Sequence, residues 1–273
     1  MEQMTGPIDS DLVPVSAGRH GPRRWRRFAS YAFAKPRRTV PVVLGEHEQI
    51  AANLPILFAG RGAGLAPVAL LRVAVTGTTA LVAPNGVWRG SYVPSLLRVH
   101  PFSVRPAGDA FELLVDEASG LITDDPADEP FFDEDGTLAT PLAAVVDFFR
   151  QRAEAAQRTT AACREIEAAG LLTDPPEDSP LAGFRVIARD PLADLPRTAI
   201  ATLHRSGALA LAQAHLVARH HVGLLSHAEA HLAEATPAAP ADPLKTRESE
   251  RLSGFLDALA DAQDSDPFGP GRA

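Results

Sequence analysis

The stretch VPVVLGEHEQIAANLPILFAGRGAGLAPVALLRVAV, residues 40–75, decides the fold class. Three short apolar runs, at residues 39–44, 54–60 and 66–75, are separated by polar or glycine-containing segments, a pattern typical of β-strands. The segment EHEQIAAN between the first two runs predicts one or two helical turns. Short sequential strands with no long helix between them favour antiparallel pairing, so we expect a β-meander or a small barrel.

The β pattern continues to about residue 122, with further short runs at 78–84, 87–94 and 110–118. Between the first two of these runs, Asn85 and Gly86 favour a two-residue type I′ hairpin turn, because both residue types tolerate positive φ. Trp88 and Tyr92 have the same parity on an extended strand, so we expect them on one face, with Arg89 on the other.

The pattern changes to helical from about residue 141. Apolar residues recur at helical spacing through residues 145–171, and Pro141 near the start with Gly170 near the end follows the usual asymmetry of helices. The run LAGFRVIA at residues 181–188 is a short strand candidate, and a short helix and a long helix are expected to meet near RSGAL, residues 205–209. We therefore predict an α+β protein, with an antiparallel β-rich N-terminal half packed against a helical C-terminal half.

Composition shifts along the chain predict its organisation. Residues 1–38, with scattered Gly and Pro and a basic cluster, are interpreted as a flexible basic arm. A globular domain follows over residues 39–235, mainly β over 39–122, an acidic loop over 123–140 and mainly helical over 141–235. Residues 236–246 read as a linker, and residues 247–273 as a short amphipathic helix with a disordered tail.

Net charge and cysteine content restrict the partners and the compartment. The formal charge of −8 argues against general affinity for nucleic acid, although eight Lys/Arg against three acids make residues 1–40 locally basic. Cys163 is the single cysteine, which excludes an intrachain disulfide. RRWRRFAS lacks the apolar run that an export signal needs, and the run LAPVALL stops at Arg72, short of a membrane span. We expect a cytoplasmic protein with no membrane span.

Motifs that would name an enzyme are absent from the sequence. It contains no G-x-S-x-G elbow, no Walker A loop and no G-x-G-x-x-G after a predicted strand. The segment FFDEDG does not complete an EF-hand, because Phe131 and Leu142 occupy positions that require oxygen ligands. Enzymatic activity is left open, a non-enzymatic role is favoured, and no cofactor is expected.

Three histidines are the candidates for a metal site. His220, His227 and His231 are spaced i, i+7, i+11, which places them within about 40° on one helical face. His227 and His231, four residues apart, are spaced to hold one divalent ion. No acidic ligand lies in the same stripe, and Gly223 weakens the helix between them. We therefore predict no metal, with these three histidines as the candidates if one binds.

The ordered motifs resemble the SapC family of bacterial proteins over roughly residues 39–230. The matching stretches include VPVVLGEHEQIAANLPILF, NGVWRGSYVPSLLRVHPF, FFDEDGTLATPL and LHRSGALALAQAHL. The resemblance implies an accessory or interaction protein associated with surface-layer or export-related systems, or alternatively an enzyme or enzyme subunit that modifies peptides or amino acids. It provides no catalytic residue set.

Two sets of site residues follow from these alternatives. A binding protein would contact another protein or a peptide through an edge near the acidic loop at 124–135, formed by Arg89, Tyr92, Arg98 and His100. An enzyme would draw its acid–base groups from Glu46, Asp116, Glu117 and His215, in a concave pocket. Oligomeric state is left open.

Overall fold

The computed structural model describes residues 12–108 and 110–235. The chain divides after Ala230 into two compact units. The first unit, Met1–Ala230, holds every element discussed below apart from the end of the last helix. The predicted linker at 236–246 and the predicted amphipathic helix and tail at 247–273 lie outside the described residues.

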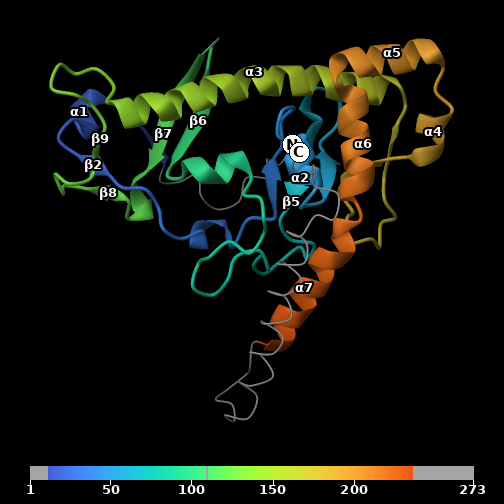
Figure 1. The fold of residues 1–273 in the computed structure, drawn as a ribbon, viewed down its shortest axis with the longest axis horizontal. Coiled ribbons are helices and arrows are strands. Elements are labelled where there is room, and N and C mark those ends of the chain that lie inside the picture. Colours follow the sequence, from blue (N-terminus) through green and yellow to red (C-terminus); the bar gives the residue numbers. More distant parts are fainter. Residues whose placement is uncertain (1–11, 109, 236–273) are drawn as a thin grey trace, which may run out of the picture. The chain divides into compact units, whose positions relative to one another are not determined.

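Antiparallel strands in the described residues form three sheets (Figure 1). A five-stranded sheet has the order β10-β11-β4-β5-β3, with β3 (Thr39–Pro41), β4 (Ile56–Ala59), β5 (Ala66–Leu70), β10 (Leu172–Thr173) and β11 (Phe184–Ile187). A second sheet has the order β1-β7-β6, with β1 (Leu12–Pro14), β6 (Phe102–Ala107) and β7 (Ala110–Asp116). The third has the order β8-β2-β9, with β2 (Arg24–Trp25), β8 (Ile122–Thr123) and β9 (Glu129–Pro130).

The helices gather in the second half of the chain. The long helix α3 (Thr140–Ala168) is followed by α4 (Arg189–Ala193), α5 (Arg197–Ser206), α6 (Ala208–Ala218) and α7 (His221–Ala235). Shorter helical segments lie earlier: α1 (Ala17–His20), α2 (His47–Ala51) and the 3-10 turns η1 (Ala32–Ala34), η2 (Gly62–Gly64), η3 (Ser95–Val99) and η4 (Glu117–Ser119). None of the helices within the described ranges is long and apolar enough to cross a membrane.

The α+β prediction is confirmed, and its detail is refined. Antiparallel sheets dominate the N-terminal half and helices the C-terminal half. The strands do not form one meander or one closed barrel, because β10 and β11 come from the helical half and complete the sheet of β3, β4 and β5. Strand β6, which pairs with β7 in a hairpin, was not among the predicted runs.

Helix α3 packs against two separate cores (Figure 1). Its first turns contribute Leu142 and Phe149 to a cluster with Phe102 and Phe131, on the side of β6 and β7. Its last turns contribute Cys163 to a cluster with residues of α5 and α6. Burial raises the pKa of the Cys163 thiol to about 12, so this thiol is protonated at neutral pH and fills space in the core.

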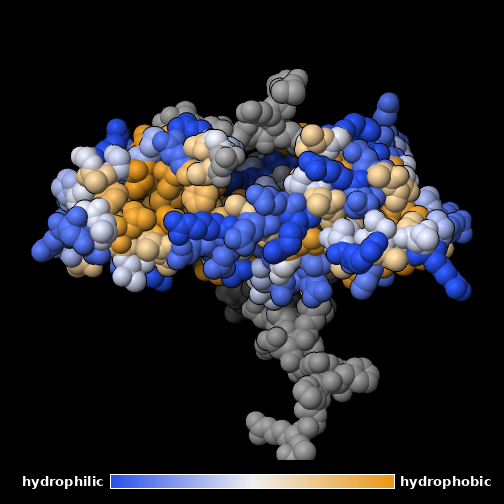
Figure 2. All heavy atoms as spheres, turned by 90° about the horizontal axis from the view of Figure 1, so that it is seen from above, coloured by the Kyte–Doolittle hydropathy of each residue, from blue (hydrophilic) through white to orange (hydrophobic). Residues whose placement is uncertain are grey.

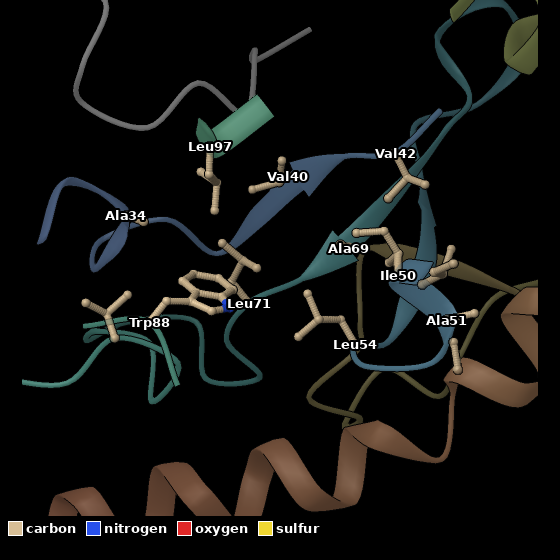
Figure 3. Close-up of a cluster of buried hydrophobic side chains, with 13 residues drawn as sticks. Ala34, Val40, Val42, Ile50, Ala51, Leu54, Ala69, Leu71, Trp88 and Leu97 are labelled. Atoms are coloured by element: carbon tan, nitrogen blue, oxygen red, sulfur yellow. The ribbon is translucent and has the colours of Figure 1, made fainter. Parts of the chain in front are cut away.

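A third cluster lies between β3, β5, α2 and the segment before η3, and Figure 3 shows its side chains. Ile50 and Ala51 reach it from α2, which the sequence predicted as helical turns between two strands. Trp88 reaches it from the segment before η3, and Leu97 from η3 itself. Strands β4 and β5, which the apolar runs of residues 40–75 predicted, are buried along almost their whole length.

Residues 78–94 are not strands, contrary to the prediction. The described structure gives this segment one isolated bridge, between Val82 and Trp88. A turn does link them, but its hydrogen bond runs from the N–H of Gly86 to the carbonyl of Ala83, so Pro84 and Asn85 are its central residues. Residues 88–92 form a loop, in which the indole Nε1 of Trp88 donates a hydrogen bond to the Tyr92 carbonyl at 3.0 Å.

The N-terminal segment differs from the flexible arm that its composition predicted. Residues 12–38 contribute β1, α1, β2 and η1, and they bury His20, Trp25 and Ala34. Strand β1 pairs with β7, and β2 lies between β8 and β9. The strands are two or three residues long and pair with partners about a hundred residues away, so they leave no periodic pattern in the sequence.

The acidic segment at 123–140 is also more ordered than a loop. It supplies part of β8 and all of β9, and an isolated bridge joins Phe132 to Leu138. Phe131 is fully buried between these features. Five of its seven acidic residues are exposed, and Phe131 and Phe132 pack against the core. The acidic composition predicted a loop, and it gave no sign that the two phenylalanines attach the segment to the core.

Candidate functional site

An open groove lies where β2, η1 and η3 approach the first turns of α3. Its volume is about 500 Å³. Its lining combines six aromatic or histidine rings, five smaller apolar residues and two arginines: Trp25, Phe28, Tyr31, His100, Phe102 and Phe148; Ala29, Val99, Pro141, Ala144 and Val145; Arg27 and Arg98. In Figure 2 apolar surface gathers on the left, the end at which α3 begins in Figure 1.

His100 belongs to the aromatic lining and carries no charge at neutral pH. Its ring stacks on Phe33, with centroids 3.9 Å apart and planes 16° from parallel, and Phe28 approaches its edge. Burial, with a further contribution from the charge of Arg37, lowers the pKa of His100 to about 4. The predicted role of His100 at a contact surface is therefore that of a neutral ring.

Trp25 lines the groove with a buried indole. The side chain is 5% exposed and meets Phe102 edge to face at 4.9 Å between centroids. Its indole Nε1 is buried and has no hydrogen-bond partner among the described residues. A buried N–H without a partner costs free energy, and such groups are rare in folded proteins.

Arg98 is one of the two exposed arginines that line the groove. Its Nε donates to the Val93 carbonyl at 3.0 Å, and its Nη2 donates to the Tyr92 hydroxyl at 2.8 Å. The guanidinium lies 5.0 Å from the centre of the Tyr92 ring. No carboxylate within residues 12–108 and 110–235 forms an ion pair with Arg98. Arg27 has only a long contact, 3.9 Å from its Nε to Glu129.

Glu46 lies behind Arg98 in a buried polar network. One carboxylate oxygen accepts from Arg152 Nη1 at 2.9 Å, and the other accepts from the Ser95 backbone N–H at 3.0 Å and from the Tyr92 hydroxyl at 3.3 Å. Arg152 also donates to the Pro41 carbonyl at 2.6 Å. The network joins the end of β3, the start of α2, η3 and α3.

The environment of Glu46 keeps its carboxylate ionised. Burial alone would raise its pKa, but hydrogen bonds from Ser95 and Arg152, together with the charge of Arg152, hold the pKa below its ordinary value. An ionised carboxylate with both oxygens engaged is suited to holding elements together. It is poorly suited to proton transfer at neutral pH, for which a pKa near the working pH is needed.

His215 lies elsewhere, buried on α6 against the five-stranded sheet. Its Nδ1 is 2.7 Å from the Ile56 carbonyl, and its Nε2 is 3.1 Å from the backbone N of Ile187. The neutral ring with its proton on Nδ1 satisfies both bonds, joining β4 and β11 to α6. Burial lowers the pKa of His215 to about 4. The structure brings together neither His215 and Glu46 nor His215 and the groove.

Of the other predicted residues, some are held by structural partners and some line the groove. Glu117 forms a bidentate pair with Arg19, at 2.7 and 2.6 Å, and lies 3.2 Å from His20 Nε2. Asp116 ends β7, and its N–H donates to the Pro101 carbonyl. Arg89 is exposed but does not line the groove. Of the four predicted contact residues, Arg98 and His100 therefore line the groove and Tyr92 supports Arg98 from behind.

The histidine stripe is interrupted. His220 lies in the turn between α6 and α7, so the continuous helix assumed by the spacing does not exist. His227 is an exposed residue of α7. Within the part of the chain that the structure describes, no group of three or more His, Cys, Asp or Glu side chains is arranged to hold a metal ion.

Sequence reasoning missed the residues of the groove that come from the basic N-terminal segment. Trp25, Phe28 and Tyr31 lie in RRWRRFASY, which was assigned to the arm. The available signal was the alternation of arginines with aromatic residues, which is unusual for a solvated tail. Arg152 was also missed, because a single arginine in a long helix gives no sign of a partner 106 residues away.

Comparison with known proteins identifies one family. The model of the family described as SapC matches residues 15–225, which include the groove, the Glu46 network and His215. The match begins within the segment that composition assigned to the arm, in agreement with the ordered structure of residues 12–38. Neither the search of curated proteins nor that of solved structures found a match.

Proposed function

The chain belongs to the SapC family, and on that premise we propose that it is an accessory protein that binds a protein or peptide partner through the groove. The observation that carries this proposal is the combination of a largely apolar lining with an exposed arginine that has no carboxylate partner among the described residues. Tryptophan, tyrosine and arginine are the residues that most often dominate binding energy at interfaces.

The state of the candidate acid–base groups supports a binding role over a catalytic one. Glu46 is ionised and engaged by three donors, His215 is neutral and engaged through both ring nitrogens, and Glu117 is paired with Arg19. Each group has a structural partner that a catalytic role would have to displace. The groove itself is lined by no aspartate or glutamate.

We propose further that the partner belongs to a surface-layer or export-related system, as the family's associations imply, and that the protein acts in the cytoplasm. The cysteine usage supports this compartment, because the single thiol is buried and forms no intrachain disulfide. Fractionation of the native host tests the compartment, and recovery in the periplasmic or outer surface fraction would contradict it.

A matched pair of substitutions on α3 tests the proposed surface. Ala144 is exposed and lines the groove, whereas Ala153 is exposed nine residues further along, on the opposite side of the helix. Both are replaced by glutamate, which favours helix and adds the same charge. Tagged wild type and both variants are then purified from the native host, and the recovered proteins are quantified by mass spectrometry.

The proposal predicts a partner that co-purifies with wild type and Ala153→Glu and is depleted at least about tenfold with Ala144→Glu, a loss of about 1.4 kcal/mol in binding. Circular dichroism and thermal melting confirm that both variants are folded. Equal recovery with Ala144→Glu and wild type would contradict the proposed surface. A partner lost from Ala153→Glu alone would place the interface elsewhere.

A further inference from the structure

We infer that the occupant of the groove is an acidic peptide segment that carries a large apolar side chain, with its carboxylate held by Arg98. The inference rests on the proposed function and specifies the chemistry of the partner. Three features of the groove carry it: the sign of its charge, the free donors of Arg98, and the apolar cavity beside them.

The charge of the groove is opposite to that of the chain. The protein has 34 acids and 26 basic residues, yet the groove lining contains Arg27 and Arg98 and no acid. His100 adds no charge at neutral pH. Glu129 approaches Arg27 only at 3.9 Å, and both side chains are exposed, so this contact offsets little of the positive potential. An anionic ligand is therefore favoured over a neutral or cationic one.

Arg98 presents donors that are already oriented. A guanidinium has five N–H donors, and Arg98 uses one on Nε for Val93 and one on Nη2 for Tyr92. Three N–H groups remain without an acceptor among the described residues, two on Nη1 and one on Nη2. This free edge matches the two oxygens of a carboxylate. Because Tyr92 and Val93 hold the guanidinium, less conformational entropy is lost on binding.

The remainder of the groove fits an apolar side chain next to that carboxylate. Phe102, Val145 and Phe148 provide apolar walls. Trp25 adds an indole ring to these walls. The apolar side chain of a peptide covers this surface and removes it from water. A cavity of about 500 Å³ lies within the range that binding pockets occupy.

The test uses the full chain and four blocked pentapeptides. Their sequences are Gly-Asp-Phe-Asp-Gly, Gly-Asn-Phe-Asn-Gly, Gly-Lys-Phe-Lys-Gly and Gly-Asp-Ala-Asp-Gly, acetylated and amidated so that termini add no charge. Isothermal titration measures binding to the wild type. In a Trp88→Phe background, Trp25 is the remaining tryptophan, so its fluorescence reports occupation of the groove. If that background does not fold, titration of the wild type still decides the result.

The acidic phenylalanine peptide is expected to bind, to change Trp25 emission saturably, and to weaken as salt is raised. Arg98→Gln is expected to weaken it by at least about tenfold, which corresponds to loss of one charge-assisted pair. Arg89→Gln is the matched control, an exposed arginine of the same segment outside the groove, and should leave binding unchanged.

Several results would overturn the inference while leaving the proposed function intact. Equal or tighter binding of the Asn or Lys peptide would show that the groove binds peptides without requiring acid. Binding unaffected by Arg98→Gln would remove the proposed anchor. Binding of no peptide would overturn the proposed occupant, as would binding of vesicles containing anionic phosphatidylserine in preference to every peptide. In each case the co-purification test with Ala144→Glu and Ala153→Glu decides separately whether the groove is the contact surface.

Discussion

At the scale of single residues, the Glu46–Arg152 ion pair holds the candidate site in shape. The two side chains are about one tenth exposed, and the pair connects α3 to the segments that carry Tyr92 and Ser95. The sequence identified Glu46 and Tyr92 as candidates but assigned them to competing functions. Their partnership could not be predicted, because the three-dimensional contact depends on α3 and on the irregular path of residues 78–94.

Replacing Glu46 by alanine is expected to lower the free energy of unfolding by about 3–5 kcal/mol, because Arg152 is then left buried without its counter-charge. Urea denaturation measures the change. Glu48→Ala, an exposed substitution on the same short helix, should stay within about 0.5 kcal/mol of wild type. A cost below about 1 kcal/mol for Glu46→Ala would show that the ion pair is not structural.

His215 provides a pH-dependent test of its structural role. Its pKa is about 4 in the folded protein against an ordinary value of 6.5, so the unfolded state binds the proton more readily. The stabilisation is complete above pH 6.5 and is lost as pH falls toward 4, by roughly 3 kcal/mol in total. His215→Gln should reduce the slope of stability between these pH values by about 1.4 kcal/mol per unit.

Denaturant titrations at pH 4.5, 5.5, 6.5 and 7.5 measure that slope. His204→Gln, which removes an exposed imidazole of α5, is measured beside it for comparison. If His215→Gln retains the wild-type slope, the titration does not belong to His215. The ring would then not be kept neutral by its burial on α6.

At the scale of elements, Gly207 separates α5 from α6, as the predicted hinge near RSGAL required. Its φ is 78°, in the left-handed region that favours glycine, and a Cβ there would lie 3.1 Å from Leu44. The long helix α3 and its end before Gly170 were also predictable, since apolar spacing and end signals lie within the helix itself. The break between α6 and α7 has no such local signal and was not predicted.

Two glycine-to-alanine substitutions should therefore have opposite effects on stability. Gly207→Ala is expected to cost about 1–3 kcal/mol, because alanine must adopt a left-handed conformation beside Leu44. Gly223→Ala lies within α7 with no atom within 4 Å of the added Cβ, and should stabilise by about 0.5–1 kcal/mol. Thermal melting compares them, and a destabilising Gly223→Ala or a neutral Gly207→Ala would contradict the helix geometry.

At the scale of the whole molecule, the sequence predicted class and order but not long-range pairing. The apolar runs within residues 40–75 identified the central strands. A strand that is buried on both faces has consecutive apolar residues, and β4 and β5 are buried in this way. The third sheet could not be predicted from the sequence. Its strands β2, β8 and β9 have only two residues each, and β2 pairs with β8 and β9 about a hundred residues further along the chain. The groove depends on that pairing, which is why its position was not predictable.

The N-terminal segment is accordingly expected to be required for folding. Deletion of residues 1–38 removes β1, β2 and the buried Trp25, and should abolish cooperative thermal unfolding. The point substitution Trp25→Ala should cost about 3–5 kcal/mol, whereas the neighbouring exposed Arg26→Ala should change stability by less than about 1 kcal/mol. A deletion variant that melts cooperatively at the wild-type temperature would restore the flexible-arm interpretation.

The most direct test of the central claim, that the groove is a contact surface for a partner polypeptide, is site-specific photo-crosslinking in the native host. A benzophenone amino acid is placed at Ala144 in the groove, or at Ala153 on the opposite side of α3. A cross-linked adduct with a second polypeptide is predicted at position 144, reduced by Arg98→Gln, and absent at position 153. Adducts of equal yield at both positions, or at 153 alone, would contradict it.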